Sequence, residues 1–240
     1  MRERPVSAIP GFVPLLLALT LTAQVALRAV EPHPAADARE LPPPPTAAML
    51  RLAALGEPIA LAQMLTLYLQ AFDTQPGVSI PFRDLDYGRV QGWLAAIIGL
   101  DPDGQYPLMM AAQVYSRVPD PARQRQMLDF VHREFLEDPV RRWRWLAHAA
   151  IMAKHRLNDT ALALKYAQSL ARHADHPEVP GWARQMHIFV LEDMGEYETA
   201  RVLLGGLLAS GAVTDPREAR FLTERLNELQ AAEKSTPSSR

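Results

Sequence analysis

Hydrophobic residues recur at helical spacing over most of the chain. The clearest stripe lies near the C-terminus, where apolar side chains at spacings of three and four share one face of a helix: Tyr197, Ala200, Leu203, Leu204, Leu207 and Leu208. The same periodicity runs through residues 47–55, 59–71 and 85–99. Ala and Leu dominate, and β-branched residues are few, which favours helix over sheet. The pattern predicts an all-α protein.

An apolar run without helical alternation stands near the N-terminus. It extends from Ile9 to Leu27, and only three polar residues interrupt its second half. A bilayer core requires roughly 20 apolar residues. Three interpretations compete: a cleaved signal peptide, an uncleaved signal-anchor helix and a buried core helix. The run has almost no polar face, and no small-x-small pair follows it closely, so the pattern favours a transmembrane anchor at residues 9–28.

The basic residues around this run bear on its orientation. Arg2 and Arg4 precede the run, whereas Arg28 and Arg39 follow it, so the positive-inside bias is thin. A short tail before a signal-anchor usually stays cytoplasmic. We therefore expect residues 1–8 to form this tail, with a single pass through a bacterial inner membrane and the following domain in the periplasm.

Prolines mark the next segment, residues 29–46. Six of the 21 prolines fall within residues 31–46. Such a composition favours extended polyproline II and predicts a semi-rigid linker that holds the domain clear of the membrane. The alternative is a proline motif that binds an aromatic-lined groove.

Residues 47–105 are predicted to form N-terminal helices with an inserted loop at residues 72–83. Loops of this length within compact domains are often functional, or else packed against the body. Apolar residues alternate along the loop, as in a short packed extended segment. Ile80, Phe82 and Arg83 are its candidate contact residues.

A repeat follows in the second half of the chain. Four prolines stand at intervals of 37, 38 and 39 residues: Pro102, Pro139, Pro177 and Pro216. An aromatic residue follows each proline: Tyr106, Trp145, Trp182 and Phe221. Fourteen residues after each of the first three aromatics comes an acid: Asp120, Asp159 and Glu196. Regular intervals with shared internal spacing indicate a helical repeat.

Each unit of this repeat predicts two helices, A and B. The aromatic residue starts helix A, a tight turn follows, the acid stands near the start of helix B, and the proline ends the unit. An acid in the first turn complements the free N–H groups and the helix dipole. A small residue is expected four positions after the acid, where the helices cross. Ala163 and Ala200 meet this expectation, whereas Gln124 does not.

The unit resembles a tetratricopeptide (TPR) repeat, whose second helix begins Gly-Asp-Tyr-x-x-Ala. The matching residues here are Gly195-Glu196-Tyr197 and Ala200, and a weaker copy lies around Asn158-Asp159. The resemblance covers Tyr106 to Leu229 and implies a right-handed solenoid of helical hairpins. The period exceeds the family's of about 34 residues, and helix A lacks the family's central Gly. Half-TPR and generic hairpin solenoids therefore remain alternatives.

Residues 106–232 would then hold the repeats and a capping helix that begins at Pro216, and residues 233–240 a disordered polar tail. In the TPR family, helix A lines the concave face that binds partners. Carried over by position, this face comprises Trp145, His148, Met152, His155, Trp182, Gln185, Phe189 and Glu192. Aromatic anchors among polar residues suit peptide recognition, while core packing is the other reading of each aromatic.

Charge and composition narrow the chemistry. A net charge of -2 argues against a nucleic-acid binder, and the absence of Cys excludes disulfides and thiol catalysis. The seven His form no His–Glu–x–x–His motif. We therefore expect no metal, no cofactor and no enzymatic activity.

The densest basic-aromatic run spans residues 141–145, Arg-Arg-Trp-Arg-Trp. Its functional interpretations are contact with phosphate, with an acidic partner or with lipid headgroups. The favoured interpretation is structural, with Trp145 packed and the arginines solvated or paired with Glu134, Glu137 and Asp138.

Together these features predict a membrane-anchored scaffold that binds a protein or peptide in the cell envelope, as an accessory or assembly subunit. The alternative is a structural subunit that uses the array for packing within a larger complex. An envelope hydrolase is the third class, and it would require converging His or carboxylate side chains.

Overall fold

The computed structural model describes residues 10–30 and 38–235. The predicted N-terminal tail, part of the proline-rich linker and the last five residues of the predicted polar tail lie outside this range. The chain divides into two compact units: Met1–Arg39 with Thr74–Ser79, and Glu40–Asp73 with Ile80–Arg240. Each unit is described by itself.

The first unit contains the apolar N-terminal helix, α1 (Phe12–Val30). Its described side chains are all exposed. Residues Phe12–Ala29 are long and apolar enough to cross a membrane by length and composition. Helix α1 is therefore a candidate for the predicted transmembrane span.

A short β-hairpin completes the first unit. Strand β1 (Thr74–Gln75) pairs antiparallel with β2 (Val78–Ser79). Gly77 has φ 78°, a value that glycine adopts freely, so Pro76-Gly77 suits the turn. The side-chain amide of Gln75 bonds both backbone groups of Arg39, at 2.9 and 2.8 Å.

The second unit is helical throughout. Its elements are α2 (Ala47–Ala53), α3 (Pro58–Ala71), η2 (Phe82–Asp84), α4 (Tyr87–Leu100), α5 (Tyr106–Met109), η3 (Met110–Val114), η4 (Tyr115–Arg117), α6 (Pro121–Glu137), α7 (Pro139–His155), α8 (Thr160–His173), α9 (Gly181–Asp193), α10 (Tyr197–Ala209) and α11 (Pro216–Ser235). The strands β1 and β2 are the only ones among the described residues. The predicted all-α class is confirmed.

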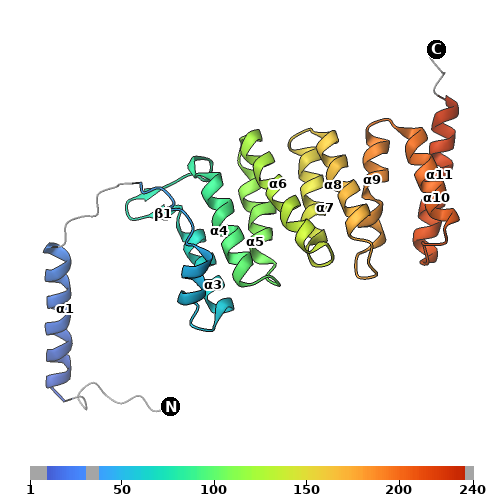
Figure 1. Cartoon of the computed structure of the whole chain (residues 1–240). Coiled ribbons are helices and arrows are strands. Elements are labelled where there is room, and N and C mark those ends of the chain that lie inside the picture. The colour runs from blue at the N-terminus through green and yellow to red at the C-terminus, as the bar shows by residue number, and fades with distance from the viewer. Residues whose placement is uncertain (1–9, 31–37, 236–240) are drawn as a thin grey trace. The chain divides into compact units, whose positions relative to one another are not determined.

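Helices in the second unit pack mainly on their neighbours in sequence, and α6 to α11 follow one another side by side (Figure 1). The three repeat units pair α5–η4 with α6, α7 with α8, and α9 with α10. The first member of each pair is helix A and the second is helix B. Helix α7 also contacts α5 and η3 before it and α9 after it. The A helices of successive units are therefore adjacent.

The acids of the repeat stand at the starts of the B helices. Asp120 Oδ1 accepts from the backbone N–H groups of Ala122 and Arg123, and Asp159 Oδ1 accepts from Leu162 at 2.8 Å. Both are N-caps of the expected kind. Glu196 holds the same position before α10, but its side chain makes no capping bond.

The small residues expected at the helix crossings are buried. Ala163 and Ala200 are completely buried. Gln124, which breaks the pattern, is buried too and donates from Nε2 to the carbonyl of Val118. This hydrogen bond gives the buried Gln124 amide a partner.

The positions of the prolines and aromatics differ from the predicted unit. Pro139 and Pro216 are the first residues of α7 and α11. The N–H groups of the first helical turn have no partner within the helix, so proline, which lacks an N–H, loses no hydrogen bond there. Trp145 and Phe221 consequently lie in the second turns of these helices, although Trp182 is near the start of α9.

Two apolar clusters form the interior of the second unit. The larger extends from Leu41 to Val190, and the smaller joins α9, α10 and α11. Ile80 and Phe82 from the predicted loop pack against the larger cluster. Arg83, the third loop candidate, is exposed beside Asp84.

The later part of the proline-rich segment belongs to this packing. Leu41 is buried in the larger cluster, and Trp93 Nε1 on α4 donates to the carbonyl of Pro42 at 2.8 Å. The folded body therefore begins before the predicted boundary at residue 47.

Candidate functional site

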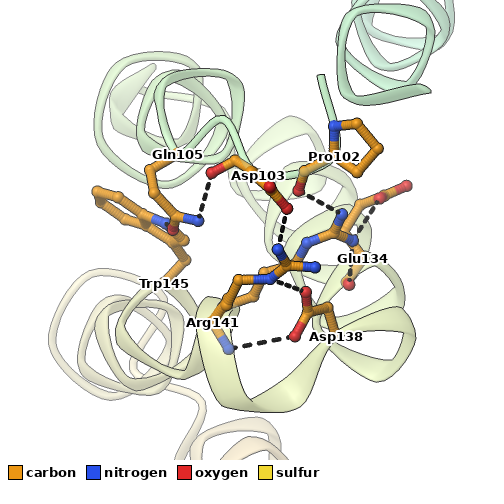
Figure 2. A network of polar contacts seen from close by, with 8 residues as sticks. Pro102, Asp103, Gln105, Glu134, Asp138, Arg141 and Trp145 are labelled. Atoms are coloured by element: carbon orange, nitrogen blue, oxygen red, sulfur yellow. Dashed lines mark hydrogen bonds and ion pairs between the residues drawn. The ribbon is translucent and has the colours of Figure 1, made fainter. Parts of the chain in front are cut away.

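The basic-aromatic run lies at the start of α7, where it meets α6 and the loop before α5 (Figure 2). The Arg142 side chain is buried. Its Nη1 donates to the carbonyl of Glu134 at 2.7 Å and lies 3.2 Å from Glu134 Oε2. Its Nη2 reaches the Pro102 carbonyl at 3.4 Å. One guanidinium thus bonds α6 and the preceding loop at once.

Arg141 adds a second set of contacts in this network. It pairs with Asp138 on its own helix start and with Asp103 in the loop. Trp145 is half-buried, and its Nε1 donates to Gln105 Oε1 at 2.7 Å (Figure 2). The expected pairing of the arginines with Glu134 and Asp138 is confirmed, and Asp103 and Pro102 are additional partners.

Burial affects the charge of Glu134. Desolvation raises the pKa of its carboxyl, and the neighbouring Arg142 guanidinium opposes that rise. The ion pair therefore joins two side chains that are largely removed from water. Its arrangement is that of a structural bridge rather than a free anion-binding site.

The remaining aromatic of the run, Trp143, points to a different neighbour. Its ring lies 5.5 Å from the ring of Trp182 on α9, at an interplanar angle of 75°. The Arg144 guanidinium lies 5.7 Å from the Trp143 ring centroid. Trp182 is about half exposed. We call Trp143, Arg144 and Trp182 the tryptophan patch.

The predicted partner-binding residues on α7 occupy three kinds of environment. Met152 is buried in the larger cluster, and His155 is exposed. His148 is half-buried, and its Nε2 is enclosed without a hydrogen-bond partner among the described residues. Burial and the nearby Arg117 lower the pKa of His148, against a hydrogen bond to the Ala112 backbone.

The predicted partner-binding residues on α9 mostly contact residues of α11. Gln185 Nε2 donates to Glu218 Oε1 at 2.7 Å. The ring centroids of Phe189 and Phe221 are 6.2 Å apart. Glu192 is buried and pairs with Arg225 at 2.6 Å.

Of the eight predicted residues, Trp182 and His155 are exposed, whereas Met152, Gln185 and Glu192 are buried. Their membership of a binding face stays a prediction.

Trp143 and Arg144 were absent from the predicted face. A signal for them existed in the sequence, because Trp143 precedes Trp182 by 39 residues, one of the observed repeat intervals. The predicted repeat places Trp145 at the equivalent position instead, because Asp159 follows it by 14 residues.

Open cavities lie between the helices of the second unit. One of about 460 Å³ lies between α3, α4 and α5, beside Gln70 and Tyr106. Another, of about 400 Å³, lies among α9, α10 and α11 and is bordered by Arg184, His187 and Glu218. Within residues 10–30 and 38–235, no three His, Asp or Glu side chains gather closely enough to hold a metal ion.

Comparisons with protein-family models, with curated proteins and with solved structures found no match.

Proposed function

We propose that this protein is a membrane-anchored, TPR-like scaffold that binds a protein or peptide partner. The observation that carries the proposal is the tryptophan patch. Large aromatic side chains contribute strongly to binding where they are accessible. Trp143 and Trp182 come from successive A helices, and Trp182 is about half exposed.

The proposed scaffold is a right-handed solenoid of helical hairpins. Three features support it: helices pack on their sequence neighbours, the A helices of successive units are adjacent, and Ala163 and Ala200, the small residues of the B helices, are completely buried. In such an array each unit stabilises the next, and the A helices present a continuous surface.

The proposed location is the inner membrane of a bacterium, with one pass through α1 and the second unit in the periplasm. The length and apolar composition of α1 support the span. Protease added to spheroplasts should digest the second unit, whereas a cytoplasmic marker should survive. Protection of the second unit until the membrane is broken would reverse the proposed orientation.

The partner-binding proposal is tested by crosslinking in membranes. Trp182→Ala removes an exposed ring, so we expect at least a tenfold loss of the crosslinked partner with unchanged helical content. Phe189→Ala tests the adjoining α9 surface. Val202→Ala is the matched control, because Val202 is exposed on the B helix α10. Equal crosslinking by Trp182→Ala and wild type would overturn the role of the patch.

A second candidate is a structural subunit of a larger complex. The observation that favours it is the exposure of Val202 and Leu203 on α10, since apolar surface on a B helix suits packing against another protein. Val202→Asp would then release the protein from its complex, while Trp182→Ala would leave the complex intact.

A further inference from the structure

The helices α2 and α3 form a bent pair, the α2–α3 elbow, that exposes an unusual amount of apolar surface. The chain bends by 112° between the two helices. More than half of each of six large apolar side chains is exposed: Met49, Leu52, Leu55, Ile59, Met64 and Leu67. Only Ala62 and Leu69 of α3 are fully buried.

Charge is almost absent from this surface. Between Leu41 and Phe72 the only charged residues are Arg51 and Glu57, and α3 has none. A helix that faces water normally carries charged residues on its outer side, as α6 does with Arg125 and Arg133. The elbow therefore has the composition of a surface that is covered by an apolar phase.

Leu55 stands at the corner of the elbow in an unfavourable backbone conformation. Its φ is 48°, in the left-handed region that residues with a Cβ seldom adopt, and Gly56 follows with φ 94°. The Leu55 side chain is 89% exposed, the highest value among the large hydrophobic residues described. This left-handed turn ends α2 and leaves the Leu55 side chain facing outward.

The chain between α1 and the second unit is short. Helix α1 ends at Val30, and Leu41 is already buried in the second unit. The ten residues between them make eleven Cα–Cα steps from Val30 to Leu41, which can span at most about 40 Å. If α1 crosses a bilayer, as the proposed function holds, the beginning of the second unit remains within this distance of the membrane surface.

We propose that the α2–α3 elbow inserts its apolar face into the interface of the bilayer that α1 spans. The apolar side chains extend around α3 rather than along one narrow stripe, which suits a fluid acyl phase better than a shaped protein groove. Because the elbow has so few charges, its insertion depends on buried apolar area and little on anionic lipid or salt.

The test uses the full chain in phosphatidylcholine vesicles. The protein has no cysteine, so Leu55→Cys offers a single site for an environment-sensitive fluorophore. Gln168→Cys, on the exposed side of α8, is the matched control. We expect blue-shifted emission and at least twofold quenching by lipid-borne quenchers at position 55, and neither at position 168. Added anionic lipid or salt should change the position-55 signal by less than a third.

Resistance to carbonate extraction reports on α1 separately. A chain that resists extraction but has a water-exposed label at position 55 overturns the elbow proposal and leaves the anchor intact. A chain that is extracted but still quenched at position 55 supports the elbow and contradicts the anchor. Blue-shifted emission without lipid quenching overturns the proposal, because a protein surface or a second copy then covers the elbow.

A variant of the elbow checks that the signal comes from insertion. With the label at Met64→Cys, the double change Leu52→Ser and Leu55→Ser should reduce quenching at least twofold. Both leucines are exposed, so helical content measured by circular dichroism should stay at the wild-type level. Undiminished quenching in this variant would contradict insertion through the corner.

Discussion

At the scale of single residues, three half-buried histidines share one electrostatic situation. Burial lowers the pKa values of His132, His148 and His187 below the ordinary value of 6.5. Each is therefore protonated more readily in the unfolded chain than in the folded one. Since the unfolded state then binds more protons, the contribution of these histidines to folding stability is present above pH 6.5 and is lost progressively as the pH falls below it.

We expect the melting temperature to drop as the pH is lowered from 7.5 to 5.5. His148→Gln removes one contributor, so its drop should be smaller than that of the wild type. His155→Gln, an exposed substitution on the same helix, is the control and should retain the full drop. Equal drops in His148→Gln and the wild type would show that His148 is not linked to folding. Thermal scans followed by circular dichroism make this comparison.

Residues with local roles were the ones that the sequence predicted well. Asp120 and Asp159 cap helices through bonds to N–H groups two or three residues away, so their spacing sufficed. The burial of Arg142 and the meeting of Trp143 with Trp182 depend on segments far apart in the chain. Periodicity within one helix carries no information about such contacts.

At the scale of elements, the guanidinium of Arg142 connects α6, α7 and the loop at Pro102. We expect Arg142→Ala to lower the free energy of unfolding by about 3 kcal/mol, because it leaves the half-buried Glu134 carboxylate and two carbonyls without this donor. Arg144→Ala removes only a cation–π contact near the surface and should cost less than about 1 kcal/mol. Denaturant titration of both variants measures the difference, and equal losses would contradict the bridging role.

The predicted helices were largely found, but the hydrophobic pattern did not show what covers their faces. The apolar periodicity of residues 47–71 predicted helices and did not predict which side chains are exposed, as Met64 and Leu67 are. Hydrophobic spacing identifies a helix and cannot distinguish a face covered by protein from one covered by another apolar phase. The absence of charge in α3 was the available signal.

At the scale of the whole second unit, the buried apolar residues are unevenly distributed along the array. The smaller cluster contains six buried residues, from Ile188 to Leu229, while the larger one runs through all the preceding hairpins. In an array where units contact only their neighbours, local stability follows local packing. The last three helices should therefore open at a lower free energy than α7 and α8.

Hydrogen exchange can test this expectation. Leu222 is buried in the smaller cluster, and Leu222→Ala should cost about 2–4 kcal/mol there. Amide exchange should accelerate in α10 and α11, with α7 and α8 unchanged. Uniform acceleration along the array would show instead that the second unit unfolds as one cooperative body.

The early entry of the chain into the folded body determines how mechanical force would pass through the protein. If α1 is the membrane anchor and a partner binds at Trp182, as proposed, a pull between them would enter the second unit at Leu41 and Pro42, where Trp93 anchors the chain to α4. The load would then run from α4 through α6 and α7 to α9, along helices that contact one another in turn. The α2–α3 elbow lies outside this load path, so it could remain on the membrane while the array bears tension.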